Sequence, residues 1–303
     1  MKHIEFSIIV PAFNEEETIE KFLKNLQGVL SGIDSTYEII VVDDGSTDDT
    51  FSIVSNIQEI RVIKHPYNKG NGAAVKTGIL NAHGEKIVII DADGQHDPQH
   101  IPDMLKLLGE YDLVVGARKS FGFGGRGFGN YFVSKLATYL SGIKIPDLTS
   151  GFRAFKKDKM LEFIDLMPNG FSLPSTSTLA FATSGYNVKF IPISANVRQG
   201  GKSGINILKD GMKFIVLIIR MVSLFKPLKV FVPISGILLF FGLLWSLRTF
   251  FMTKQISSLA AMILLIGIFV FLFGLFADQI AETRLSIGKM NKLLMQKKNE
   301  IIK

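Results

Sequence analysis

The chain has 303 residues, 47% hydrophobic and only 20% charged, which is apolar for a wholly soluble protein, and its lack of cysteine excludes disulfides and thiolate metal sites. Residues 205–303 contain 13 Lys and Arg against four Asp and Glu, whereas the other 204 residues contain 21 against 23. A nucleic-acid enzyme normally carries its basic surface on the folded domain, so we expect no nucleic-acid partner and assign the basic end to anionic lipid headgroups.

Residues 1–204 alternate between strand and helix patterns almost from the N-terminus. No signal-peptide pattern precedes the first strand, so we expect this domain to lie in the cytoplasm. The alternation predicts an α/β fold with a largely parallel sheet covered by helices. Apolar, β-branched runs predict strands at 6–10, 38–42, 61–63, 87–90 and 113–115, with helices between them at 15–30, 47–57, 71–83 and 98–109.

Polar side chains follow four of the predicted strands. Ligands of open α/β sheets bind beyond the carboxyl ends of the strands, so we expect the functional site among these residues. They are Pro11, Asn14 and Glu15 after the first strand, Asp43 and Asp44 after the second, Asp91 and Asp93 after the fourth, and Arg118 after the fifth.

The pair Asp91 and Asp93 is the sharpest candidate for a metal site. Two carboxylates one residue apart at a strand end can reach one hard cation and the diphosphate that the cation carries. The alternative is two turn aspartates before a helix that begins near Pro98, with Asp97 as its cap. The position of the pair after the apolar run IVII and before GQHDP favours the metal site.

Two glycine-rich segments flank these residues. Residues 68–72 open a helix without the spacing of a dinucleotide-binding or P-loop motif, yet this helix N-terminus could approach a nucleotide or phosphate. Residues 121–129 are predicted to form a loop. That loop is either a flexible connector or a lid that grips phosphate through Arg118 and Arg126, and the sequence leaves both open.

Residues 205–228 are predicted to form an amphipathic helix at the membrane surface. Apolar residues recur at helical spacing, and Lys209, Asp210, Lys213 and Arg220 interrupt them. A third membrane span is the alternative, which Arg220 within the apolar stretch disfavours.

A transmembrane hairpin is predicted at 229–280, with helices at about 230–250 and 256–278. Residues 230–247 and 256–277 contain no charge, and each stretch is long enough to cross a hydrocarbon core. Buried helices of a soluble core are the alternative, but such helices seldom stay uncharged for so long. The short connection at 248–255 makes the two spans antiparallel.

The flanking charges predict which side of the membrane holds the chain ends. Basic residues cluster before the hairpin and in a basic tail at 281–303, which places both termini and the domain at 1–204 in the cytoplasm. Arg248 and Lys254 at the connection oppose this orientation but are outnumbered. We therefore expect an integral membrane protein with two transmembrane helices in a lipid bilayer.

Taken together and in order, the motifs of residues 5–204 resemble those of glycosyltransferase family 2, and within it the polyprenyl-phosphate sugar synthases of the dolichol-phosphate mannose synthase type. The ordered set is specific, whereas any one motif would not be. The motifs are VPAFNEE, EIIVVDDGSTDDT, NKGNGAA, IVIIDADGQHDP, VGAR, DLTSGFRAF and a terminal Arg198-x-x-x-Lys202.

This resemblance implies a GT-A fold and inverting, metal-dependent transfer of a hexose from a GDP- or UDP-linked donor to a polyprenyl phosphate, dolichyl or undecaprenyl. It implies catalytic roles for Asp93, Arg118, Arg126 and Arg198, and a Mg²⁺ or Mn²⁺ ion on Asp91, Asp93 and Gln95. The implied nucleotide-sugar contacts are Pro11, Asn14, Glu15, Asp43, Asp44, Lys69, Gly70 and Asp91. The implied acceptor contacts are Arg126, Asp147, Ser150, Arg198 and Lys202. The last motif departs from the family order, since Lys202 precedes rather than follows its serine.

Rival functions make different demands on the sequence. Processive polysaccharide synthases of the family carry a QxxRW motif, which is missing here, and the one tryptophan, Trp245, lies in a predicted span. Transfer to a glycan or lipid hydroxyl would need a carboxylate base, for which Asp147 is the obvious candidate. A non-catalytic scaffold would not need the intact acidic and basic motif residues. The oligomeric state, including a homo-oligomer, stays open.

Overall fold

The computed structural model describes residues 3–118, 125–170, 172–193, 219–220, 222, 224–255 and 257–302, with only the backbone for 125–130, 132, 289, 291–292 and 295–302. The chain divides into two compact units, residues 1–214 with 288–303 and residues 215–287. Each unit is described by itself below.

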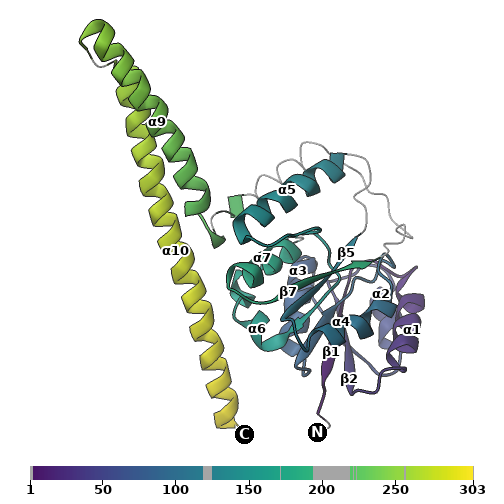
Figure 1. The fold of residues 1–303 in the computed structure, drawn as a ribbon. Helices are drawn as coiled ribbons and strands as arrows, with labels where there is room; N and C mark the ends of the chain where they lie inside the picture. The colour runs from purple at the N-terminus through teal and green to yellow at the C-terminus, as the bar shows by residue number, and fades with distance from the viewer. Residues whose placement is uncertain are drawn as a thin grey trace. The chain divides into compact units, whose positions relative to one another are not determined.

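The first unit is built on a mixed sheet with the strand order β3-β2-β1-β4-β6-β5-β7 (Figure 1). All five predicted strands are present, and the parallel pairs are β1 with β2 and β4, β2 with β3, and β5 with β7. The sheet is therefore largely parallel, as predicted, and the exception is β6, a strand that was not predicted and that is antiparallel to both of its neighbours. The strands are β1 Phe6–Ala12, β2 Tyr37–Asp43, β3 Ile60–Lys64, β4 Lys86–Ile89, β5 Leu113–Arg118, β6 Arg153–Lys156 and β7 Val188–Ile193.

Helices cover both faces of this sheet. Ile8 and Val10 share a core with the apolar stripe of α1, while Gly78 of α3 faces Ile9 on the opposite side. Burial on both faces explains why β1 is a continuous apolar run with every residue buried. The helices are α1 Ile19–Leu30, α2 Thr50–Ser55, α3 Asn71–Asn81, η1 Pro98–His100, α4 Ile101–Leu107, α5 Gly125–Ser141, α6 Lys157–Leu161, η2 Ile164–Leu166 and α7 Leu173–Thr183.

Helix α5 corrects the predicted loop at 121–129. Its backbone is helical from Gly125 onward, so the C-terminal half of that segment is helix, while the predicted residues 121–124 lie outside the described residues. The three glycines at 125, 127 and 129 lowered the helical expectation there, because glycine costs about 1 kcal/mol relative to alanine in a helix.

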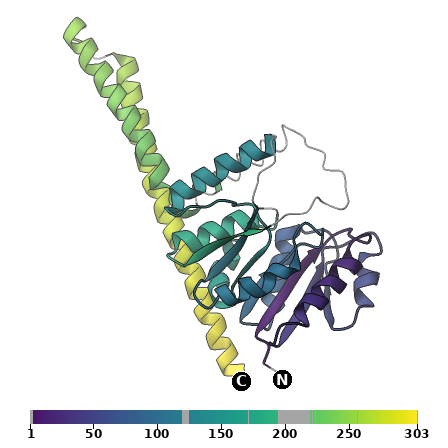
Figure 2. The same cartoon turned by 45° about the vertical axis from the view of Figure 1, so that its right-hand side comes forward.

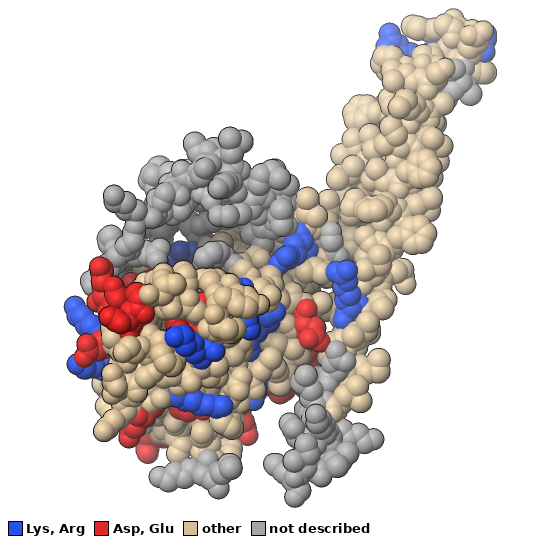
Figure 3. Space-filling view, turned by 180° about the vertical axis from the view of Figure 1, so that it is seen from behind, with Lys and Arg blue, Asp and Glu red and all other residues tan. Residues whose placement is uncertain are grey.

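The second unit contains a hairpin of two long helices, α9 Leu228–Thr253 and α10 as far as residue 287. Helix α10 begins at Ser258 and continues to Ile302, so its last part belongs to the first unit. Glycines let the two helices approach each other: Gly242 faces Leu264, Gly267 faces Leu239, and Gly274 faces Phe231. Both helices are long and apolar enough to cross a membrane, and most of their residues are exposed. Figure 3 shows almost no charged atoms along the hairpin and basic atoms at its turn. The two predicted spans are therefore confirmed as helices of the right length and composition.

Both helices of this part extend beyond the predicted spans. Arg248, which was predicted to begin the connection, lies inside α9, because that helix runs on to Thr253. The basic tail predicted at 281–303 is helical, because α10 continues to Ile302. The predicted amphipathic helix at 205–228 lies mostly outside the described residues, although 219–220, 222 and 224–225 are helical.

Candidate active site

The loops that follow β1 and β2 are fastened to each other at the carboxyl end of the sheet. The Asn14 backbone N–H donates to Ser46 Oγ at 3.0 Å, and the Thr47 N–H donates to Asn14 Oδ1 at 2.9 Å. Glu15 N–H donates to Thr50 Oγ1 at 2.8 Å. Asn14 has φ 54°, in the left-handed region that asparagine tolerates better than most residues. The predicted residue Asn14 therefore links the loop after β1 to the loop after β2 by hydrogen bonds.

The adjacent aspartates Asp43 and Asp44 are both buried but have different surroundings. Asp43 Oδ1 accepts a hydrogen bond from the Ser46 N–H at 3.2 Å, while its Oδ2 is buried without a partner among the described residues. A buried carboxylate oxygen without a donor is costly, so it suits a site where a ligand supplies the donor. Of the two aspartates, Asp43 is the one with capacity for a ligand.

Asp44 is occupied by the protein itself. Its Oδ1 accepts the Lys69 N–H at 3.0 Å and lies 2.6 Å from His65 Nδ1, and its Oδ2 accepts the Gly70 N–H at 2.7 Å. His65 Nε2 in turn lies 2.9 Å from Thr77 Oγ1. Asp44 therefore holds the segment from His65 to Gly70 against the end of β2, and it acts on a ligand only through that segment.

The N-terminus of α3, which residues 68–72 were expected to open toward a nucleotide or phosphate, packs against the backbone of residues 168–170. The Ala73 N–H donates to the Asn169 carbonyl at 3.0 Å, and side chains at Gly70 or Gly72 would overlap the backbone of residues 168–170. Gly70 also has φ 100°, which favours glycine. Lys69 remains exposed, with its Nζ 5.6 Å from the centroid of the Tyr67 ring.

Asp91 and Asp93 lie together just beyond β4. Asp91 Oδ1 accepts a hydrogen bond from Asn71 Nδ2 at 3.4 Å, and Asp93 Oδ1 accepts the Gln95 N–H at 3.1 Å. Burial raises the pKa of Asp91, and the charge of Asp93 adds to the rise against the attraction of His96. Gly151 packs directly on Asp91, and any β-carbon there would overlap Asp91 Oδ2.

The donor set at this place fits a hard divalent cation. Asp91, Asp93 and Gln95 offer only oxygen and amide donors, and the two carboxylates repel each other unless a positive charge lies between them. No group of three or more His, Asp and Glu in the described part of the chain could hold a metal. A cation here would therefore take few protein ligands and complete its shell with substrate phosphate and water, as Mg²⁺ prefers.

Arg118 and Asp147 form a partly buried ion pair across the site, in which Asp147 is fully buried and the Arg118 side chain is partly exposed. Arg118 Nε donates to Asp147 Oδ2 at 2.7 Å and its Nη2 to Asp147 Oδ1 at 3.1 Å, while Nη2 also donates to Thr149 Oγ1 at 2.7 Å. Burial opposes ionisation of Asp147, but the hydrogen bonds and charge of Arg118 outweigh it and lower the pKa of this carboxyl. The Arg118 Nη1 group has no partner among the described residues and remains available to an anion.

Arg153 is a second arginine of the site, which the sequence analysis did not single out. It is fully buried in β6, where Nη1 donates to Pro174 O at 2.8 Å and Ser177 Oγ at 2.6 Å, and Nη2 donates to the Ser150 carbonyl. Burial lowers its pKa to about 10, against the attraction of Asp147 and Asp91. In the sequence, the signal that could have identified Arg153 was its position within the apolar segment FRAF at 152–155.

His96 and Ser150 complete the buried polar groups. His96 Nδ1 and Ser150 Oγ have no hydrogen-bond partner among the described residues, and the His96 ring stacks on Phe152 with 5.4 Å between centroids. Burial lowers the pKa of His96, although Asp91 and Asp93 favour its charged form. His96 was part of the GQHDP motif, but no role was assigned to it.

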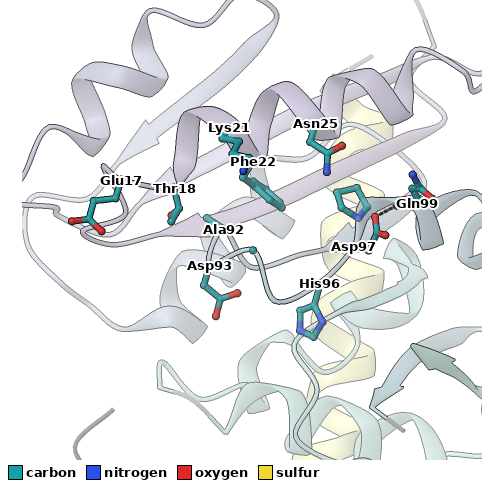
Figure 4. A pocket seen from close by; sticks show the side chains of 12 residues that line it. Glu17, Thr18, Lys21, Phe22, Asn25, Ala92, Asp93, His96, Asp97 and Gln99 are labelled. Carbon is teal, nitrogen blue, oxygen red and sulfur yellow. Dashed lines mark hydrogen bonds between the residues drawn. The ribbon is translucent and has the colours of Figure 1, made fainter. Parts of the chain in front are cut away.

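A hollow of about 320 Å³ lies between α1 and the loop from Ala92 to Gln99 (Figure 4). Among the predicted site residues, only Asp93 lines it. Figure 4 shows Asp93 and His96 on the far side of this loop from Lys21 and Asn25. The hollow therefore reaches the acidic pair at Asp93 alone and is lined by none of the predicted nucleotide-sugar contacts.

The remaining predicted residues are only partly described. Pro11 is buried within β1. Arg126 lies in the first turn of α5, where only the backbone is described. Arg198 and Lys202 lie outside the described residues. The site that the structure describes thus joins the ends of β1, β2, β4 and β5 with the start of β6.

Comparison with known families gives two matches along the chain. Residues 7–162 match the model for glycosyl transferase family 2, and residues 226–283 match the model for a GtrB C-terminal hairpin. The first match covers the sheet up to β6, and the second covers α9 and the apolar part of α10. The division of the chain into two units follows these two matches.

Curated relatives extend over most of the chain. A dolichol-phosphate mannosyltransferase of Pyrococcus furiosus is 29% identical over 84% of this chain and 76% of its own length. A protein of Methanocaldococcus jannaschii without assigned function is 32% identical over 71% of this chain and 91% of its own length.

Solved structures share the fold of the first unit. Glucosyl-3-phosphoglycerate synthase from Mycobacterium tuberculosis, in complex with Mn²⁺, UDP and phosphoglyceric acid, has a TM-score of 0.58 at 22% identity, covering 73% of this chain and 78% of that chain. The same synthase with Mg²⁺ and UDP has a TM-score of 0.57 at 21% identity, covering 73% and 79%. This likeness confirms the expected GT-A type of α/β fold.

Proposed function

The chain belongs to glycosyltransferase family 2, and from this premise we propose that it transfers a hexose from a GDP- or UDP-linked donor to a polyprenyl phosphate, dolichyl or undecaprenyl, with inversion. The observation that carries the proposal is a site with an acidic pair and an arginine that occupies Asp147, the candidate base, in a chain with an apolar helical hairpin. The naming of the Pyrococcus relative as a dolichol-phosphate mannosyltransferase supports the same acceptor class.

For the donor, we assign the diphosphate to the acidic pair and the nucleoside to the end of β2. Asp91, Asp93 and Gln95 would hold Mg²⁺ or Mn²⁺, which would neutralise the diphosphate as it leaves. Asp43, whose Oδ2 has no partner among the described residues, would accept a hydrogen bond from the nucleoside. The solved synthase structures with UDP and either cation support such a cation in this fold.

For the acceptor, a phosphate is already anionic at neutral pH and needs no base to attack the anomeric carbon. The protein must instead hold two negatively charged partners together, which fixed cations do by electrostatic stabilisation and positioning. Arg118 keeps Nη1 available for this purpose while Asp147 fixes its plane. We propose that Arg126, Arg198 and Lys202 assist it, with Ser150 lining the acceptor pocket.

The surroundings of Asp147 argue against it as the base for transfer to a hydroxyl group. Asp147 is fully buried, both of its oxygens accept hydrogen bonds from Arg118, and its pKa is lowered. A general base works best with a pKa near the operating pH and needs access to the proton that it removes. Asp147 therefore fits the role of orienting Arg118 better than that of a base.

We further propose that α9 and the apolar part of α10 cross the bilayer, with both termini and the sheet domain in the cytoplasm. The length and composition of the helices support the crossing, and the excess of basic residues before and after the hairpin supports the orientation.

The decisive experiment uses the purified full chain in nanodiscs. A panel of GDP- and UDP-hexoses is offered with dolichyl or undecaprenyl phosphate, and the lipid products are identified by mass spectrometry. We expect one donor to give a polyprenyl-phosphate hexose, and excess chelator to abolish it. Cation-dependent release of free sugar without any lipid product would contradict the acceptor assignment.

A further inference from the structure

The turn of the hairpin carries two cations, Arg248 and Lys254, that the proposed reaction does not use. Both are exposed, and Figure 3 shows basic atoms at this end of the hairpin. No acidic residue occurs between Asp210 and Asp278, so the hairpin itself offers neither cation an acidic partner. Cations at this end also oppose the proposed orientation in the membrane. A negative charge from outside the chain would compensate them.

The packing of the two helices gives the depth of Arg248. Figures 1 and 2 both show α9 and α10 side by side along the hairpin. Gly267 faces Leu239, and the same antiparallel register brings Arg248 level with Ser258, where α10 begins. From Lys229 to Arg248 an α-helix rises about 29 Å, which is close to the thickness of a hydrocarbon core, about 30 Å. With α9 across a bilayer, Arg248 therefore lies at the edge of the hydrocarbon.

An aromatic ring accompanies each of the two cations. The Arg248 Cζ lies 5.7 Å from the centroid of the Trp245 ring, and the Lys254 Nζ lies 5.9 Å from the centroid of the Phe250 ring. Trp245 is 43% exposed and Phe250 is 45% exposed, while Phe251, beyond Arg248, is 72% exposed. Arg248 thus has exposed apolar side chains on both sides along the helix. A cation in such a position belongs at the boundary between hydrocarbon and headgroups.

Lys254 lies at the outer side of that boundary. It follows the last residue of α9 and caps the helix, since its N–H donates to the Phe250 carbonyl at 2.8 Å. Along the helix axis it lies about 9 Å beyond Arg248, whereas the headgroup layer of one leaflet is about 5–8 Å thick. The two cations therefore bracket the layer in which the phosphates of the lipids lie.

We propose that Arg248 and Lys254 form a binding site for an anionic phospholipid in the leaflet at the turn of the hairpin. The lipid phosphate would lie between the guanidinium and the ammonium groups, with its acyl chains beside Trp245. A zwitterionic lipid offers the same phosphate together with a cation, which the two side chains repel. The proposal rests on the membrane insertion proposed above and is independent of the sugar donor.

This site differs from the proposed acceptor site. In the proposed orientation, the turn of the hairpin lies across the bilayer from the domain that carries the acidic pair, so its lipid is not the substrate. A bound anionic headgroup would instead neutralise the two cations that oppose this orientation. The site would thereby stabilise the inserted hairpin in the orientation that keeps the domain in the cytoplasm.

Trp245 is the only tryptophan of the chain, so its fluorescence reports on the surroundings of Arg248 directly. The purified full chain is reconstituted into bilayers of phosphatidylcholine with a fixed fraction of phosphatidylglycerol. In one sample the phosphatidylglycerol is brominated near the top of its acyl chains, and in the other an equal amount of phosphatidylcholine is brominated. Because bromine quenches tryptophan only at short range, the difference in quenching measures which lipid is enriched beside Trp245.

We expect phosphatidylglycerol to be enriched at least about fivefold, the preference that one cation near an anionic membrane surface contributes. Arg248→Gln should remove most of the preference, whereas Arg248→Lys, which keeps the charge, should retain part of it. Lys229→Gln removes one charge at the opposite end of α9 and is the matched control, which should keep the full preference. Quenching by brominated phosphatidylcholine and circular dichroism check that each variant is inserted and folded.

The outcomes separate the lipid site from the membrane insertion. Equal quenching of the wild-type protein by both brominated lipids would overturn the site and leave the insertion intact. A preference that persists when Arg248→Gln and Lys254→Gln are combined would overturn the assignment to these two cations. Loss of the preference in excess soluble glycerol phosphate would show a site for free anions and also overturn it. No quenching by either lipid would remove the insertion and the site together.

Discussion

Replacing Gly151 by alanine should disable the site while leaving the fold intact. Gly151 lies two residues before β6, and the carboxylate of Asp91 occupies the space that a side chain at position 151 would need. An added β-carbon would overlap Asp91 Oδ2 and would lie 3.3 Å from Asp91 Cγ and 3.6 Å from Oδ1. The carboxylate, rather than the strand backbone, is the part that can move, so Asp91 should rotate or shift by about 1 Å to restore normal contacts.

The size of the effect follows from the role of Asp91. A misplacement of about 1 Å in a positioning group can cost about 10²-fold in rate, and overpacking one methyl group costs about 1–3 kcal/mol of stability. We therefore expect Gly151→Ala to lower kcat/KM by about 10²-fold and to weaken cation binding, with a modest loss in melting temperature. Activity should fall far more than stability.

The assay pairs transfer rates with Mn²⁺ binding measured by electron paramagnetic resonance, and thermal unfolding by circular dichroism. Gly28→Ala is the matched control, because Gly28 lies in α1 with no atom near its missing β-carbon. That variant should keep full activity and gain up to about 1 kcal/mol from the better helix former. Wild-type Mn²⁺ affinity and rate in Gly151→Ala would refute the inference that the Asp91 carboxylate is held by this contact.

Further changes test the other groups of the site. Asp93→Asn should abolish transfer while the protein stays folded and membrane-bound; full wild-type turnover in excess chelator would remove the basis of this expectation. Asp44→Asn should cost about 1–3 kcal/mol and weaken donor binding, because its amide would face backbone N–H donors; unchanged donor affinity by calorimetry would contradict it. Asp147→Asn should cost about 3 kcal/mol by leaving Arg118 without its buried partner. Because folding lowers the pKa of Asp147 from 3.8, this difference should be constant above about pH 5 and shrink as the pH falls below about 4 in thermal unfolding; a constant difference at lower pH would contradict it. Arg126→Ala should raise the KM for polyprenyl phosphate or lower kcat with donor affinity nearly unchanged, and Arg126→Lys should recover only part of the loss; weakened donor binding instead would move Arg126 to the diphosphate.

The sequence predicted the parallel half of the sheet well because those strands are buried on both faces. Burial of both faces selects continuous Ile and Val runs, which local composition shows directly. It did not predict β6, a strand of four residues that begins with the fully buried Arg153. A buried arginine is stabilised by partners far along the chain, here in α7, and such partners are not visible in local composition.

The same limit applies to the site. Strand ends predicted which acidic residues gather at the sheet edge, but not which of them are already occupied. Asp43 and Asp44 are neighbours of the same type. Only the positions of His65, Lys69 and Gly70 in the fold show that both oxygens of Asp44 already have hydrogen-bond partners within the protein. Likewise, the pairing of Asp147 with Arg118 joins residues 29 positions apart.

The partners that the aspartates of the site already have within the protein bear on the nature of the acceptor. Asp44 is held by backbone N–H groups, Asp147 is held by Arg118, and Asp43 is buried with one oxygen that has no partner among the described residues. Burial and, to a lesser extent, the charge of Asp93 raise the pKa of Asp91, and a cation held by Asp91 and Asp93 would remove both as bases. A hydroxyl acceptor would then find no carboxylate in this group able to take its proton, whereas a phosphate acceptor needs none. The distribution of partners around five aspartates thus favours an acceptor that arrives already ionised.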